Sequence, residues 1–173
     1  MKGSVFVGTS LDGFIARRDG SFDFLPTDGG EPHGYTEFMT SVDALLIGRK
    51  TYETALGFGE WFYGKKPVFV LSHRPLPPAP AGAVVERLSG APHEVAAELG
   101  RRGIGHAYVD GGETIHQFLA AGFIQRIIVT RVPVLIGTGI PLFGPLTRDI
   151  PLTHVATRHF PSGLVQSEYL VVS

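Results

Sequence analysis

The sequence contains no cysteine among its 173 residues. This absence excludes disulfide bonds, zinc sites with thiolate ligands and catalysis by a cysteine nucleophile. No apolar run approaches the roughly 20 residues that a membrane-spanning helix needs, and the first apolar stretch is too short for a signal peptide. We therefore expect a soluble, cytoplasmic protein that has no membrane partner.

An excess of one charge is also absent, because 15 basic residues stand against 16 acidic residues. This balance gives no indication of a nucleic-acid partner. The seven histidines show no H-x-x-x-H or H-x-H spacing, and His154 and His159 would face opposite sides of a strand, so we expect no metal site. The stretch "GTSLDG" lacks the second glycine of a serine-hydrolase elbow, because Asp12 occupies that position.

Glycine and proline are abundant, with 23 and 13 residues, and they separate short apolar runs. Strands that alternate with helices predict an α/β fold with a mainly parallel sheet covered on both faces. A final antiparallel hairpin makes this sheet mixed, and we expect one domain over residues 1–173. The expected strands are 4–9, 43–48, 66–72, 83–88, 106–110, 125–137 and a hairpin over 152–172, and the expected helices are 35–41, 49–56, 92–103 and 111–122. Within 125–137, Pro133 suggests a bulge or the end of the pairing.

The stretch "LLIGRKTYE" joins a buried strand to a helix, and it places Arg49, Lys50 and Thr51 directly after Gly48. In α/β sheets ligands bind beyond the carboxyl ends of the strands. Unpaired amides and the positive end of the helix dipole attract anions there. A capping Thr51 beside a solvated basic pair is the simpler alternative. However, basic residues in a first helical turn oppose the dipole, which favours an anionic ligand.

Two further strands end in segments suited to bind an anion. "VFVLSHR" ends in a hydroxyl and basic side chains, and "AYVDGGETIHQFL" has a glycine pair before a helix. The glycine pair allows the backbone to approach a pyrophosphate closely. Neither the G-x-G-x-x-G fingerprint nor a G-x-x-x-x-G-K-[ST] loop is present. Together the three strand ends predict a ligand with more than one phosphate, and their charge favours NADPH over NADH. The additional candidate residues are Ser72, His73, Arg74, Gly111, Gly112, Glu113 and Thr114.

Five motifs follow one another along the chain, namely "TSLDGFIA", "LLIGRKTYE", "KPVFVLS", "VDGGETIHQFL" and "VPVLIGTGIPLF". In this order they resemble the dihydrofolate reductase-like superfamily, and within it the riboflavin-biosynthesis reductase domain. The resemblance implies a three-layer α/β/α dihydrofolate reductase-like fold, NADPH as the cofactor and a homodimer. The long apolar segment 127–136 offers an edge through which two copies could pair. The resemblance covers the chain from Gly3 to Phe143.

The resemblance also implies roles for single residues. The segment 48–51 matches the cofactor-phosphate turn, 72–74 lies near the adenosine 2′-phosphate, and 111–114 matches the pyrophosphate loop. "SLDG" then belongs to a loop beside the nicotinamide, although its Asp-Gly pair is also a common hairpin signal. The residues implied near the substrate are Ser10, Leu11, Gly13 and Gly137.

Asp12 is the candidate catalytic residue, because its carboxylate could orient the acceptor or relay a proton. A turn-forming role, in which the carboxylate binds nearby backbone amides, is an equal alternative. Gly34 aligns where dihydrofolate reductases place an acid, and "GYTEFMTS" lacks the basic residues of the riboflavin enzymes. The cofactor half therefore matches the family better than the substrate half.

The sequence thus predicts an NADPH-dependent reductase that transfers a hydride to a small heteroaromatic or imine-type substrate. The resemblance implies an activity like that of 5-amino-6-(5-phosphoribosylamino)uracil reductase. Two alternatives stay open, namely a dihydrofolate or pteridine reductase and a non-catalytic NADPH-binding module.

Overall fold

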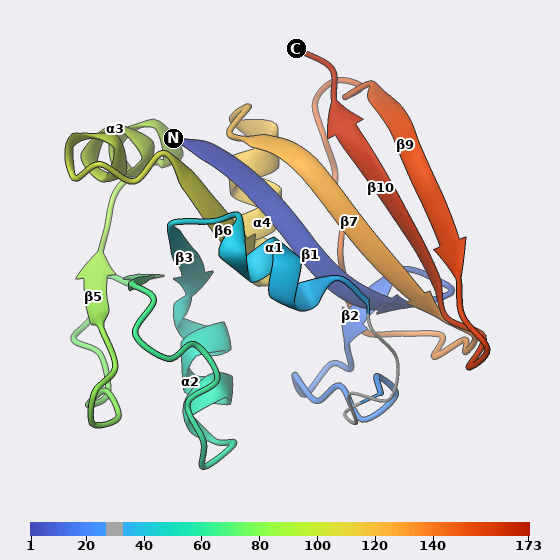
Figure 1. Cartoon of the computed structure of the whole chain (residues 1–173), viewed down its shortest axis with the longest axis horizontal. Helices are drawn as coiled ribbons and strands as arrows, with labels where there is room; N and C mark the ends of the chain where they lie inside the picture. Colours follow the sequence, from blue (N-terminus) through green and yellow to red (C-terminus); the bar gives the residue numbers. More distant parts are fainter. Residues whose placement is uncertain (27–32) are drawn as a thin grey trace.

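The computed structural model describes residues 1–26 and 33–173. Its centre is an eight-stranded sheet in the order β5-β4-β3-β6-β1-β7-β10-β9 (Figure 1). The strands from β5 to β7 are parallel, whereas β10 runs antiparallel to both β7 and β9. This confirms the predicted mixed sheet with a C-terminal antiparallel hairpin. The bounds are β1 (Lys2–Ser10), β3 (Ala44–Gly48), β4 (Val68–Leu71), β5 (Val85–Leu88), β6 (His106–Asp110), β7 (Ile124–Val132), β9 (Leu152–His159) and β10 (Val165–Val171).

Helices cover both faces of this sheet, which gives three layers. In β3, Leu45 and Ile47 pack with α1 and α2, whereas Leu46 packs with α3 and α4 on the opposite face. Alternating side chains thus enter two separate cores, which explains why this strand is apolar throughout. Each large apolar side chain buried in this way contributes roughly 1.5–3 kcal/mol to stability. The helices are α1 (Tyr35–Thr40), α2 (Arg49–Leu56), α3 (Pro92–Arg101) and α4 (Gly112–Ala120).

Strand β7 differs from the prediction in length and in position. It ends at Val132, just before Pro133, where the sequence suggested a bulge or the end of the pairing, and it does not continue to residue 137. Pro133 has no amide hydrogen to continue the pairing, and the Val134 amide turns back to the Val132 carbonyl at 2.8 Å. β7 also lies between β1 and β10, so it is not an edge through which two copies could pair. The free edges of the sheet are β5 and β9.

The Asp-Gly pair at 12–13 forms a turn, but it does not close a hairpin with β1. Gly13 has a φ of +88°, and its amide donates to the Ser10 carbonyl at 3.0 Å. The following strand β2 (Phe14–Ala16) pairs instead with β8 (Ile140–Pro141) in a separate two-stranded ribbon. The simple hairpin is therefore excluded. Within residues 1–26 and 33–173, no helix has the length and apolar character to cross a membrane.

Candidate cofactor and active site

A cavity of about 450 Å³ lies beyond the carboxyl ends of β3, β4 and β6. Three segments that are far apart in the sequence meet there, because parallel strands end at the same edge of the sheet. The cavity also includes Ser89 and Gly90, which follow β5 and which the sequence analysis missed although they too stand at a strand end. All eleven residues predicted to hold the coenzyme line this cavity: Gly48, Arg49, Lys50, Thr51, Ser72, His73, Arg74, Gly111, Gly112, Glu113 and Thr114.

Two helices begin at this cavity, and glycines bring their first turns into contact. A Cβ atom at Gly111 would lie 2.6 Å from Thr51 Oγ1, and one at Gly48 would lie 2.9 Å from Thr114 Oγ1. The first turn of α2 contains no acid, and no side chain caps its amides, so Thr51 is not the cap of this helix. The unpaired amides of α2 and α4 therefore direct two positive helix ends toward one space.

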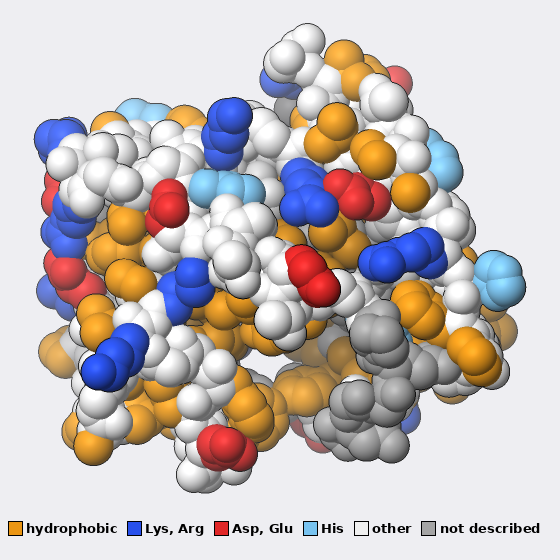
Figure 2. Space-filling model, viewed as in Figure 1, with side chains coloured by type: hydrophobic (Ala, Val, Ile, Leu, Met, Phe, Trp, Pro, Cys, Tyr) orange, Lys and Arg blue, Asp and Glu red, His pale blue; other side chains and the backbone are white. Residues whose placement is uncertain are grey.

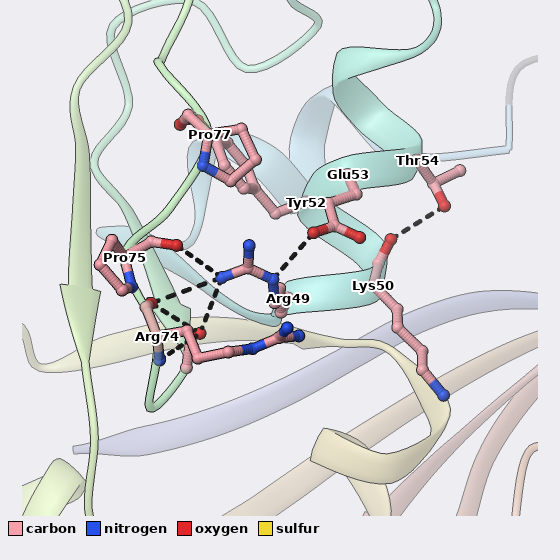
Figure 3. A network of polar contacts seen from close by, with 9 residues as sticks. Arg49, Lys50, Tyr52, Glu53, Thr54, Arg74, Pro75 and Pro77 are labelled. Carbon is pink, nitrogen blue, oxygen red and sulfur yellow. Dashed lines mark hydrogen bonds and ion pairs between the residues drawn. The ribbon is translucent and has the colours of Figure 1, made fainter.

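Arg49 joins α2 to the chain that follows β4 (Figure 3). Its Nε donates to Glu53 Oε1 at 2.8 Å, and its Nη1 donates to Ser72 Oγ at 3.1 Å and to the Pro75 carbonyl at 2.7 Å. A longer contact of 3.4 Å reaches the Arg74 carbonyl. The guanidinium is thus engaged by protein groups, and it holds the 72–75 segment against the helix.

Lys50, His73 and Arg74 are the basic residues of this cavity whose side chains are not engaged in this way. In the part of the chain that the structure describes, neither the Lys50 ammonium nor the Arg74 guanidinium has a hydrogen bond or an ion pair. Figure 3 shows the Lys50 side chain extending away from the Arg49 network. These free cationic groups are suited to bind phosphate oxygens by charge-assisted hydrogen bonds.

A second cavity of about 280 Å³ adjoins the first and shares Lys50, Thr51 and Gly111 with it. In Figure 2 a hollow with hydrophobic side chains on its walls lies below α1, between α2 and the segment of β2. The two cavities thus border each other at these shared residues, and the second has the more apolar walls. The apolar walls come from β1, β2 and the chain after β2, with Phe6, Val7, Ile15, Ala16, Phe22 and Leu25.

Asp110 is the one acid that lines the second cavity among the described residues. It is the half-buried last residue of β6, and the Gly111 amide donates to its Oδ1 at 2.9 Å. Burial raises the pKa of Asp110 above its ordinary value, and the Gly111 hydrogen bond opposes this shift only in part. Burial, with a contribution from the Asp110 charge, also raises the pKa of Tyr35 to about 12. Because its pKa is raised, the Asp110 carboxyl group holds a proton more readily than the carboxyl group of an exposed aspartate, as a proton donor requires.

The RibD C-terminal domain family model matches residues 2–166. The chain belongs to the RibD C-terminal domain family. The uncharacterized protein YwjB of Bacillus subtilis (strain 168) is 32% identical over 169 residues, which cover 96% of this chain and 95% of YwjB.

Solved structures agree with this family and show how widely the fold is shared. A crystal structure from Shewanella sp. PV-4, whose protein is named for riboflavin biosynthesis, superposes with a TM-score of 0.90 at 34% identity over the whole of both chains. The dihydrofolate reductase from Enterococcus faecalis, complexed with NADP(H), superposes with a TM-score of 0.65 at 16% identity over 99% of this chain and 97% of that one. The RibD C-terminal domain described here thus has a dihydrofolate reductase-like, reductase-type fold.

In this RibD C-terminal domain, Asp12 lies on an exposed turn and lines neither cavity. Its carboxylate accepts hydrogen bonds from the Gly137 amide at 2.8 Å and the Ile136 amide at 3.3 Å. A hydrogen bond from Ser10, together with these amides, holds the pKa of Asp12 below its ordinary value. These contacts favour the turn-forming alternative over the proton relay.

The four residues expected near the substrate, Ser10, Leu11, Gly13 and Gly137, also lie outside both cavities. The reason is the path of the chain, because the turn at 12–13 directs β2 toward β8 and so brings the residues after the turn to the cavity wall. The second cavity is therefore lined by residues between 15 and 25 and not by 10–13, and the substrate role of Ser10, Leu11, Gly13 and Gly137 stays a prediction.

Proposed function

We propose that this protein is an NADPH-dependent reductase that transfers a hydride to a small heteroaromatic or imine-type acceptor. The observation that carries the proposal is the meeting of two helix N-termini with Lys50 and Arg74 in one cavity, beside an apolar cavity that holds Asp110. NADPH, when bound, supplies the hydride. We propose with it that residues 1–173 form one reductase domain that acts in the cytoplasm.

Different residues of the chain would bind the coenzyme, position the 72–74 segment and transfer the proton. Lys50, His73 and Arg74 would hold the 2′-phosphate, while the first amides of α2 and α4 would hold the pyrophosphate. Arg49 would act as a positioning residue that orients the 72–74 segment. Asp110 would give its proton to the acceptor nitrogen of a C=N bond as the hydride reaches the carbon. The C=N bond thereby becomes CH–NH, and the coenzyme is oxidised. Water then returns a proton to the Asp110 carboxylate.

The coenzyme assignment predicts stronger binding of NADPH than of NADH. Charge-assisted hydrogen bonds contribute about 1.5–3 kcal/mol each, so removing either Lys50 or Arg74 should lower the NADPH/NADH affinity ratio by about tenfold or more. Calorimetric titration of Lys50→Gln and Arg74→Gln measures this ratio. Arg18→Gln is the matched control, because Arg18 is exposed and lines neither cavity.

Equal affinity for both coenzymes, or an unchanged ratio in both variants, would contradict the assignment. A pure binding module is tested separately. Steady oxidation of NADPH in the presence of an acceptor excludes that module, whereas binding without oxidation by any acceptor supports it.

The homodimer stays a proposal, and the free edge β9 is a better position for it than β7. Every residue of β9 is exposed, and Leu152, Val155, Val165 and Leu170 are exposed apolar residues of β9 and β10. Figure 2 shows hydrophobic side chains over these strands at the upper right. An uncovered edge strand of this kind pairs readily with a second copy of itself.

Light scattering should therefore give twice the chain mass of 18.6 kDa. The double variant Val155→Glu/Leu170→Glu should give the single mass. Val84→Glu is the control, because Val84 is an exposed valine beside the opposite edge strand β5. A single mass for the unmodified protein would refute the dimer.

A further inference from the structure

The charges on the walls of the second cavity restrict the acceptor that it can bind. Among the described residues, these walls carry one cation, Lys50, and one acid, Asp110. Lys50 also lines the first cavity, where its ammonium is available to the coenzyme phosphates. The other walls are apolar or carry uncharged groups such as the hydroxyls of Thr51 and Thr54.

Among the described residues, arginines close to the second cavity are paired with other side chains, and Arg17 Nε pairs with Asp23 at 2.5 Å. Arg126 and Arg158 line a different cavity, which also touches Phe6. There Arg126 Nε pairs with Glu168 at 2.6 Å, and Arg158 Nη2 donates to Gln166 Oε1 at 2.8 Å. Both arginines thus have partners within their own cavity.

A phosphate group would be poorly bound in these surroundings. It carries a charge of about −1.5 to −2 at neutral pH, and proteins bind it with arginine, lysine or helix N-termini. In this site Arg74 and His73 line only the first cavity, and the groups that the second cavity shares with it, namely Lys50 and residues at the N-termini of α2 and α4, are those proposed to hold the coenzyme. The second cavity would in addition place the phosphate near the Asp110 carboxyl group.

We propose that the acceptor is an uncharged heterocycle of one or two rings, without a phosphate group, whose ring nitrogen or N–H pairs with the Asp110 carboxyl group. Its flat faces would pack against apolar walls such as Ile15 and Phe22. This inference rests on the proposed reductase function, and it names the substrate class of the same site.

Two matched pairs of probes test the inference. They are 5-amino-6-(ribosylamino)uracil and 7,8-dihydroneopterin, each with and without a phosphate on its side chain. Calorimetric titration into the protein saturated with NADP⁺ measures binding without requiring turnover. We expect the phosphate-free member of at least one pair to bind at least tenfold more tightly than its phosphorylated partner. Equal or tighter binding of the phosphorylated members, or binding of none of the four probes, would overturn the inference.

A variant with an added charge makes the test sharper. Thr54 is exposed and lines the second cavity, and its hydroxyl donates to the Lys50 carbonyl within α2. Thr54→Lys should raise the affinity of the phosphorylated probes at least fivefold, whereas the uncharged control Thr54→Gln should not. No gain with Thr54→Lys would count against the inference. Failure of NADPH itself to bind would overturn the proposed function, whereas a preference for phosphorylated probes would overturn only the acceptor class.

Discussion

Replacing Asp110 with asparagine is expected to lower kcat by about 10²–10⁴-fold, which is the usual contribution of a positioned proton donor. Asparagine keeps the size of the side chain, and its oxygen can still accept the hydrogen bond of the Gly111 amide. It cannot give up a proton at any accessible pH. The measurement is single-turnover oxidation of bound NADPH with the acceptor that binds most tightly.

The pH dependence follows from the burial of this carboxyl group. Since burial raises the pKa of Asp110, its protonated form persists to higher pH than that of an exposed aspartate. The rate of the unmodified protein should fall as the pH rises through this raised pKa, and the rate of Asp110→Asn should not. A rate of the unmodified protein that stays constant over this range would contradict the proton-donor role.

The contribution of Asp110 to the stability of the fold should also fall as the pH rises. A carboxyl group whose pKa is higher in the folded than in the unfolded state stabilises the fold fully only below its unfolded pKa. This contribution is lost as the pH rises through the folded pKa. The free energy of unfolding of Asp110→Asn should therefore increase relative to the unmodified protein as the pH is raised, which urea titrations at several pH values would measure.

Asp12→Asn is the informative comparison for Asp110→Asn. Weakening the hydrogen bonds to the Ile136 and Gly137 amides should lower the stability slightly, because these bonds are exposed to water. The pH dependence of the rate should stay the same, because Asp12 lies outside both cavities. A rate that loses its pH dependence in Asp12→Asn but keeps it in Asp110→Asn would return the proton transfer to Asp12.

The fold could be predicted well where local signals and tertiary packing agree. Helix α2 was expected over 49–56 and has these bounds, because glycines stand on both sides of it. The end of β7 could be predicted only in part. Pro133 suggested a bulge or the end of the pairing, but the apolar pattern continues to residue 137, whereas the pairing with β1 stops at Val132. Position in the sheet is also a property of the whole chain, so the apolar run of β7 suggested an edge where the structure has an interior strand.

The two halves of the site differ in how far the sequence could predict them. The cofactor half follows from one general property, since parallel strands bring their carboxyl ends together whatever lies between them in the chain. The substrate half depends on β8, which pairs with β2 although more than a hundred residues separate them. Asp110 was not among the candidate residues, because its raised pKa results from burial. The stretch "VDGG" does not reveal this burial. An acid directly before a glycine pair at the end of a buried strand was the available signal.

Gly111→Ala is expected to weaken NADPH binding by about tenfold or more and to destabilise the fold by about 1–3 kcal/mol, the usual cost of a side chain in such a backbone conformation. Gly111 has a φ of +95°, and an added Cβ would lie 2.6 Å from Thr51 Oγ1. Because Thr51 is in the first turn of α2, relieving this contact moves the N-termini of α2 and α4 apart. Calorimetry with NADPH and urea unfolding measure the two effects.

Gly122→Ala separates the effect of backbone strain from the effect of this contact. Gly122 has a similar φ of +83°, but an added Cβ there would meet no atom within 4 Å. It also lines neither cavity. This variant should lose stability and keep its affinity for NADPH. If Gly111→Ala likewise lost stability but kept its NADPH affinity, the two helix N-termini would not act on one ligand, and the coenzyme site would have to lie elsewhere.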